Sequence, residues 1–247
     1  AEGGSRELIE YLCIAKGDVN TPMRGGVVPL LAAADSGNLE AVGCLCSAGA
    51  EVDGCMSDGT TPLFAAAQKG LLDIVVHLVE ARAELDKPKV SGATPLLMAA
   101  QQGHSEIVRC LCEARADGNR AKDGGFAPLF AAAQHGHLDA TRLLLAAGAV
   151  RQPQQHGGAT PLLAAAQSGH LLVVQCLLGD TTGRGCSSGQ RFEGAVSAVN
   201  TALADGCTPL IAAARFGHEE VCRLLLAHGA GLEAHVFGNV IIGTDGT

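Results

Sequence analysis

The chain has 247 residues, a formal net charge of −8 at pH 7 and an isoelectric point of about 5.5. Nucleic-acid binding uses a basic surface stripe, so this acidic balance argues against DNA or RNA as a partner. No apolar run approaches the ~18 residues of a membrane span, and no signal peptide is recognisable. We therefore expect no membrane insertion.

One short motif recurs along the chain at a fixed interval. Its fullest copy is Thr61-Pro62-Leu63-Phe64-Ala65-Ala66-Ala67-Gln68-Lys69-Gly70, and its proline returns at positions 29, 62, 95, 128, 161 and 209. Four consecutive gaps are 33 residues, and the last is 48, which is 33 plus an insertion of 15. A period of this kind indicates stacked, repeated supersecondary units.

Each copy of the motif predicts two short helices. Thr61 is a suitable N-cap, and Pro62 suits the first helical position because no N–H is needed there. The alanine run favours a helix, and Gly70 ends it because glycine tolerates a left-handed conformation. The apolar spacing of residues 72–79 fits a second helix better than a strand. Each unit is therefore predicted to be helix, tight turn, helix and loop.

These motifs resemble the ankyrin repeat. The resemblance rests on T-P-L, A-A, G-H, L-L and G-A, as in Thr208-Pro209-Leu210, Ala213-Ala214, Gly217-His218, Leu224-Leu225 and Gly229-Ala230. It covers roughly residues 6–234 and implies an all-α solenoid of helix-turn-helix repeats with short β-hairpin loops. One departure is consistent: an apolar residue replaces the family's histidine after T-P-L, so apolar packing must substitute for its hydrogen bonds. These residues are Leu31, Phe64, Leu97, Phe130, Leu163 and Ile211.

We assign the whole chain, 1–247, to a single domain. It starts with a partial repeat at 6–20 and ends with the truncated start of another at 235–247. Full repeats are expected near 24–53, 57–86, 90–119, 123–152, 156–200 and 204–234. Because the last residues echo the loop before Thr61, we expect the parent protein to continue. The insertion, 180–194, is either a tolerated surface loop or a contact arm using Arg184, Arg191 and Phe192.

The ten cysteines follow the repeat rather than a metal-binding or disulfide spacing. Cys44, Cys110 and Cys176 share one position of the second helix, and Cys46 and Cys112 share another. Free cysteine replaces small hydrophobic residues readily, so we predict buried, reduced thiols, with metal or disulfide chemistry as the less favoured alternative. Reduced thiols imply an intracellular, most simply cytoplasmic, location.

Two other residue types attract attention. Histidines 104, 137, 170 and 218 share the turn between the two helices, where repetition favours a structural role, such as bonding backbone carbonyls. Arg82 and Arg115 stand where other repeats have glycine. Either the helix end adjusts there, or the two arginines face an acidic partner. We find no nucleotide-binding, nucleophile or metal motif, and expect neither enzyme activity nor a cofactor.

The resemblance implies a protein–protein interaction scaffold that binds through hairpin tips and a concave first-helix face, with an unidentified protein partner and a monomeric chain. Phe126 or Phe216 is the expected apolar anchor, the alternative being that both rings fold back onto neighbouring repeats. Alternatives are a regulatory segment of a larger enzyme or membrane channel, and a structural spacer. The candidate contact residues are Asp35, Ser36, Asp58, Gln68, Lys69, Ser91, Gln101, Gln102, Phe126, Gln134, His135, Gln167, Ser168, Asp205, Arg215 and Phe216.

Overall fold

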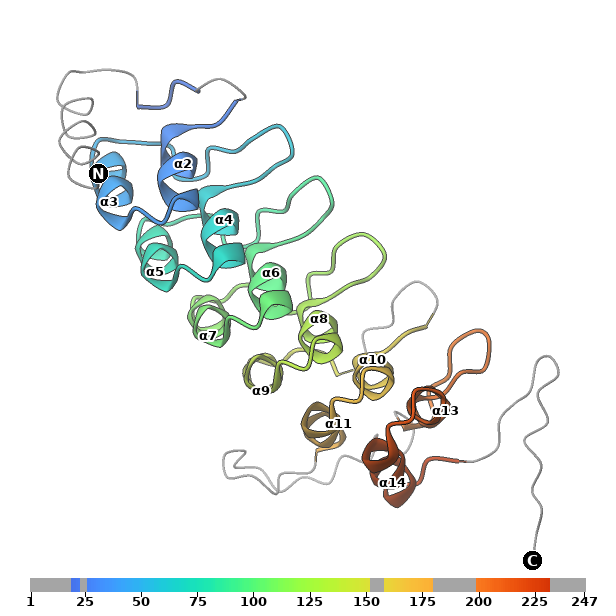
Figure 1. Cartoon of the computed structure of the whole chain (residues 1–247). Coiled ribbons are helices and arrows are strands. Elements are labelled where there is room, and N and C mark those ends of the chain that lie inside the picture. Colours follow the sequence, from blue (N-terminus) through green and yellow to red (C-terminus); the bar gives the residue numbers. More distant parts are fainter. Residues whose placement is uncertain (1–18, 23–25, 152–157, 180–198, 232–247) are drawn as a thin grey trace, which may run out of the picture. The chain divides into compact units, whose positions relative to one another are not determined.

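The computed structural model describes residues 19–22, 26–151, 158–179 and 199–231. In these residues the chain forms pairs of short helices joined by tight turns (Figure 1). The first helices of the pairs are α2 (Pro29–Asp35), α4 (Pro62–Lys69), α6 (Pro95–Gln102), α8 (Pro128–Gln134), α10 (Pro161–Gln167) and α13 (Pro209–Arg215). The second helices are α3 (Leu39–Ser47), α5 (Leu72–Glu80), α7 (Ser105–Glu113), α9 (Leu138–Ala146), α11 (Leu171–Leu178) and α14 (Glu219–Ala227). The expected all-α repeat fold is confirmed.

The contacts divide the chain into two compact units. Unit 1 comprises Ala1–Ala132 and Asp139–Val150, and unit 2 comprises Ala133–Leu138 and Arg151–Thr247. We describe the packing of each unit by itself.

The helix starts are those that the sequence predicts. Thr61 accepts a hydrogen bond from the backbone N–H of Phe64 at 3.1 Å, and Thr94, Thr160 and Thr208 make the same cap. The following proline occupies the first turn, where its missing N–H has no consequence. Thr61, Thr94 and Thr160 are buried, so these hydrogen bonds satisfy hydroxyl groups that water does not reach.

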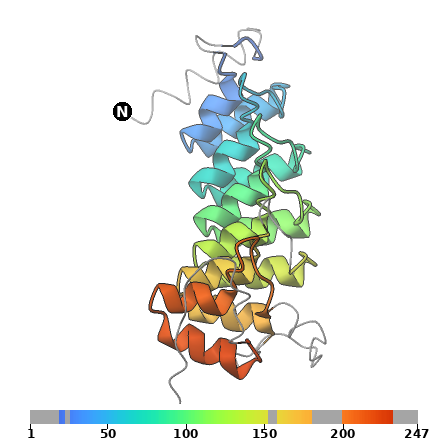
Figure 2. The same cartoon turned by 90° about the vertical axis from the view of Figure 1, so that its right-hand side faces the viewer.

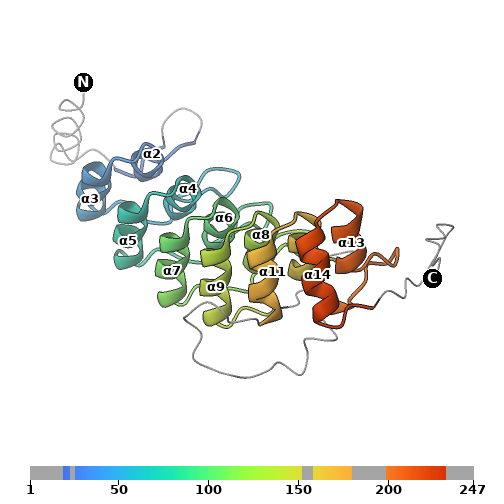
Figure 3. The same cartoon turned by 60° about the horizontal axis from the view of Figure 1, so that its bottom comes forward.

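Adjacent repeats pack through equivalent helices. In unit 1, α2 packs on α4 and α4 on α6, while α3 packs on α5 and α5 on α7. In unit 2, α10 packs on α13 and α11 on α14. Figure 2 shows the helices of unit 1, blue to green, lying roughly parallel, and Figure 3 shows the second helices α3, α5 and α7 in a row. The core therefore runs along the repeats, with an alanine pair and a leucine from each.

The alanines allow close approach of the first helices. Ala66, Ala67, Ala99 and Ala100 are all buried, and Leu78 and Leu111 of the second helices are fully buried. The apolar residue that stands in place of the family's histidine is packed, as expected. In α4 this residue is Phe64, which packs with Leu97, Ala93 and Ala131. Apolar packing thus takes over the position.

The described loops between repeats turn tightly, and none of them forms a strand. In the described loops the only bridge is an isolated one between Lys122 and Phe126. Each hairpin is closed by a hydrogen bond from a backbone N–H to the carbonyl four residues later, at 2.9–3.1 Å, for the pairs Met56–Thr60, Lys89–Ala93, Lys122–Phe126 and Leu203–Cys207. The predicted β-hairpins are therefore hairpin turns, too short for a ladder.

Three expectations lie largely or wholly outside the described residues: the partial repeat at 6–20, the insertion at 180–194 and the truncated repeat at 235–247. The single-domain assignment and the exact repeat boundaries stay predictions.

Candidate functional site

Histidines at the turn between the two helices connect successive repeats. The Nε2 atom of His104 lies 3.3 Å from the carbonyl oxygen of Gln68, in the preceding repeat. His170 makes the same contact to Gln134 at 3.1 Å, and His218 to Gln167 at 3.0 Å. A carbonyl only accepts, so Nε2 carries the proton in each case. The expected structural role is confirmed for these three histidines, and it acts between repeats.

This contact explains the glycine that follows three of the first helices, α4, α8 and α10. A Cβ added to Gly70 would lie 2.7 Å from His104, and one on Gly169 would lie 2.5 Å from His218. Both glycines also have positive φ, 79° and 75°. Glycine is therefore required twice, by the backbone conformation and by the neighbouring imidazole ring.

In unit 1, the candidate contact residues of the first helices lie at the ends of α2, α4 and α6. Lys69 reaches back to the preceding repeat, where its ammonium lies 2.7 Å from both the carbonyl and the Oδ1 atom of Asp35. Ser36 donates to the carbonyl of Ala33 at 3.0 Å. Lys69 and Asp35 therefore neutralise each other. Gln68 and Gln102 are exposed and Gln101 is half-buried, so this end of the unit is polar and nearly uncharged.

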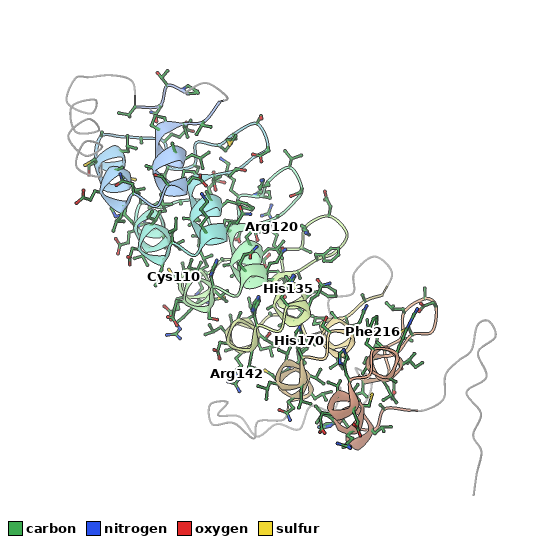
Figure 4. The ribbon with its side chains drawn as sticks, in the orientation of Figure 1. Cys110, Arg120, His135, Arg142, His170 and Phe216 are labelled. Atoms are coloured by element: carbon green, nitrogen blue, oxygen red, sulfur yellow. The ribbon has the colours of Figure 1, made fainter. Side chains whose placement is uncertain are left out.

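In unit 2, the corresponding ends belong to α8, α10 and α13. Gln134, Gln167, Ser168 and Arg215 are exposed. The exposed ring of His135 stacks on that of His137, with centroids 6.1 Å apart (Figure 4). The two units thus carry the same kind of residue on their first-helix ends.

The two aromatic candidates differ in their surroundings. Phe216 follows α13 and is 54% exposed, with its ring stacked on His218 at 6.5 Å (Figure 4). Phe126 is half-buried against Phe130, at a centroid distance of 5.4 Å and an interplanar angle of 86°. Phe216 is therefore the more accessible of the two.

The candidate aspartates at the hairpin tips shape their own turns. Asp58 accepts from the backbone N–H of Thr60, and Asp205 from that of Cys207, both at 2.9 Å. Asp58 also pairs with Lys89 of the next repeat at 2.8 Å. The hydrogen bond from Lys89, followed by those from Thr60, lowers the pKa of Asp58 to about 2. Ser91, the equivalent residue one repeat later, is exposed.

A second set of contacts between repeats was missed by sequence reasoning. In five of the described loops between repeats, a side-chain oxygen of Asn or Asp accepts from a backbone N–H 31 residues later, at 2.7–3.0 Å. The pairs are Asn20–Glu51, Asp53–Glu84, Asp86–Asp117, Asn119–Val150 and Asn200–Gly231. The recurrence of Asn or Asp at this position was a usable signal, because these side chains favour bonds to nearby backbone.

Arg82 and Arg115 keep the left-handed conformation of the glycines they replace, with φ of 66° and 74°. The proposal that the helix end adjusts is therefore wrong. Carboxylates flank both arginines in the chain, at Glu80, Glu84, Glu113 and Asp117. This acidic surrounding weakens the alternative that the pair faces an acidic partner.

The eight described cysteines are free thiols. Cys55 is exposed and the other seven are half-buried, so the expectation of buried thiols is corrected: six of the seven lie on second helices and Cys207 in the loop before α13, and solvent reaches all of them in part. Desolvation raises the pKa of Cys46, Cys110 and Cys112, which disfavours the thiolate. Within the described ranges, no group of three or more His, Cys, Asp or Glu residues is arranged to hold a metal ion.

Among the residues that the structure describes, none of the helices is both long and apolar enough to cross a membrane.

Within each unit the geometry defines a class of protein: helix pairs in which one repeat is held to the next by its turn and loop residues. Comparison with protein families agrees. The family model for ankyrin repeats in three copies matches residues 1–89, 81–155 and 151–236. The chain belongs to the ankyrin-repeat family. Comparison with curated proteins gave no match.

Proposed function

We propose that this chain is a protein–protein interaction scaffold that binds its partner through the hairpin tips and the first-helix face. We define the first-helix face as the exposed ends of the first helices in each unit. Ankyrin repeats mediate protein–protein interaction, and that family membership is the general support. The observation that carries the specific proposal is the first-helix end of unit 1, polar, exposed and held in place by contacts between repeats.

This surface has the properties of a preorganised interface. The backbone of Gln68 is fixed by His104, and Lys69 is fixed by Asp35, so little conformational freedom remains to be lost on binding. Its nearly uncharged character predicts recognition by hydrogen bonds and packing rather than by long-range charge.

The test combines capture of partners by crosslinking and mass spectrometry with two matched variants. Gln68→Arg with Gln102→Arg adds two positive charges to the first-helix face. Ser47→Arg with Val76→Arg adds the same charge to exposed positions on α3 and α5. Specific capture, weakened at least about tenfold by the first pair and unchanged by the second, supports the proposal. Equal loss in both, or loss only in the second, contradicts it.

We also infer a non-catalytic role and an intracellular, cytoplasmic location. The non-catalytic role is supported by the family and by the turn histidines His104, His170 and His218, which bond backbone carbonyls. The location is supported by the free thiols of the eight described cysteines, which persist in reducing compartments.

A further inference from the structure

Two successive hairpin tips of unit 1 pack on each other by close backbone contact. The backbone N–H of Val90 donates to the carbonyl of Asp58 at 2.8 Å. A Cβ added to Gly59 would lie 3.0 Å from the Cα atom of Lys89, so glycine is needed for this approach. Lys89 is thereby placed directly against the preceding tip.

The next pair of tips repeats the arrangement. The backbone N–H of Asp123 donates to the carbonyl of Ser91 at 3.3 Å, and a Cβ on Gly92 would lie 3.0 Å from the Cα atom of Lys122. Each of these residues stands 33 positions after its counterpart. Lys122 therefore stands against the tip at Ser91 as Lys89 stands against the tip at Asp58.

The two lysines nevertheless have different partners. Lys89 pairs with the Asp58 carboxylate at 2.8 Å and lies 5.0 Å from the ring centroid of Phe64, both in the preceding repeat. Lys122 has a serine where Lys89 has that aspartate. Its ammonium lies 5.1 Å from the ring centroid of Phe126, in its own hairpin, and forms no ion pair with any described residue. The position that a carboxylate fills at the first tip is thus open at the second.

The surroundings add charge and apolar surface. Arg120, two residues before Lys122, is exposed and likewise lacks an ion pair within the described part of the chain (Figure 4). With the exposed carboxylate of Asp123, these three residues carry a net charge of +1 in a chain that is acidic overall. Val90 is 77% exposed, and Phe126 is half-buried.

We propose that the surface of these two successive tips, formed by Val90, Ser91, Arg120, Lys122 and Phe126, binds a carboxylate side chain of a partner segment. An adjacent apolar residue of that segment rests on Val90 and Phe126. The partner's carboxylate takes the place beside Lys122 that Asp58 takes beside Lys89. This inference rests on the proposed function, because it names the chemistry of the partner for the same surface.

The probe is a blocked peptide, Gly-Ser-Leu-Glu-Leu-Gly-Ser, titrated into the isotope-labelled full chain and followed by amide NMR shifts. The matched probe replaces its Glu by Gln. We expect saturable shifts in residues 89–93 and 120–126, and binding at least about fivefold weaker for the Gln peptide. Equal binding of the two peptides, or shifts confined to other segments, overturns the proposal.

Three variants locate the carboxylate position. Lys122→Met removes the cation, and Ser91→Asp supplies an internal carboxylate. Both variants are therefore expected to bind the Glu peptide at least about fivefold more weakly. Asp58→Ser is the reciprocal control and is expected to create a second set of shifts at residues 56–60 and 89–90. Circular dichroism confirms folding of each variant.

Unchanged peptide binding in folded Lys122→Met and Ser91→Asp overturns the inference. The proposed function fails separately, if Gln68→Arg with Gln102→Arg leaves partner capture intact. The two failures are therefore distinguishable.

Discussion

At Arg82 and Arg115 the backbone is left-handed although the residue carries a side chain. Such a conformation costs roughly 1–2 kcal/mol for a residue other than glycine. A cation at a helix C-terminus recovers about 0.3–1 kcal/mol through the helix dipole, an effect that salt screens. Both arginines follow second helices directly, α5 and α7, so the dipole offsets part of the strain.

We predict that Arg82→Gly raises the free energy of unfolding by about 0.5–1 kcal/mol in about 0.5 M salt, where the dipole contribution is small. The reciprocal control is Gly49→Ala, because no atom lies within 4 Å of the added Cβ and only the φ of 85° opposes it. The Gly49→Ala variant is expected to have a free energy of unfolding about 1 kcal/mol lower than that of the wild type. Urea unfolding measures both, and destabilisation by Arg82→Gly would show that the arginine has a contact role.

Asp58 gives the chain a pH-dependent contribution to stability. Lys89 lowers its pKa from 3.8 to about 2 in the folded protein, so the unfolded chain binds this proton first as the pH falls. The contribution is therefore fully present above about pH 4 and is lost as the pH approaches 2. Asp58→Asn removes it, so the variant should lose less stability than the wild type between about pH 5 and pH 2.5. Parallel losses in urea unfolding at the two pH values would rule out this role for Asp58.

At the scale of the element, the turn between the two helices is specified from both sides. Gly70 is fixed by its own φ and by the ring of His104. We predict that Gly70→Ala costs about 2–4 kcal/mol, part from the left-handed strain and part from overlap with the ring. In a His104→Ala background the overlap is gone, and the same change should cost only about 1–2 kcal/mol. Equal costs in the two backgrounds, in a double-mutant cycle by urea unfolding, would mean that the ring moves aside freely.

Element by element, the sequence predicts what is local and misses what crosses between repeats. Thr61 and Pro62 start a helix, and Gly70 ends it, for reasons that depend only on their near neighbours. The partners of Lys89 and Lys122 depend instead on how one hairpin tip packs against the next. Phe126 shows this limit: the sequence offered it as an exposed anchor or a packed ring, and only the structure places it on Phe130.

At the scale of the whole molecule, stability spreads from repeat to repeat because contacts are between neighbours. Leu144 is fully buried in α9. We predict that Leu144→Ala costs about 2–5 kcal/mol. Amide hydrogen exchange should accelerate most in its own repeat and in those next to it in sequence, and least in α2 and α3. Equal acceleration along the chain would show that it unfolds as one cooperative body.

The candidate contact residues repeat along the chain, so the first-helix face could be predicted from the period alone. The period could not predict which of its charged side chains are available to a partner. Lys69 and Asp35 are candidates by position, yet they form an ion pair with each other at 2.7 Å. The position in the repeat determines where a side chain leaves the backbone, and the neighbouring repeat determines which groups it contacts.

The proposed function requires a protein partner to dock on the first-helix face and the hairpin tips. The most direct measurement is amide hydrogen exchange of the chain with and without a captured partner. We expect protection at residues 34–37, 67–70 and 100–103, where the first helices of unit 1 end, and at the tips 56–60, 89–93 and 122–126. Protection confined to the second helices α3, α5 and α7, with the tips unchanged, would contradict it.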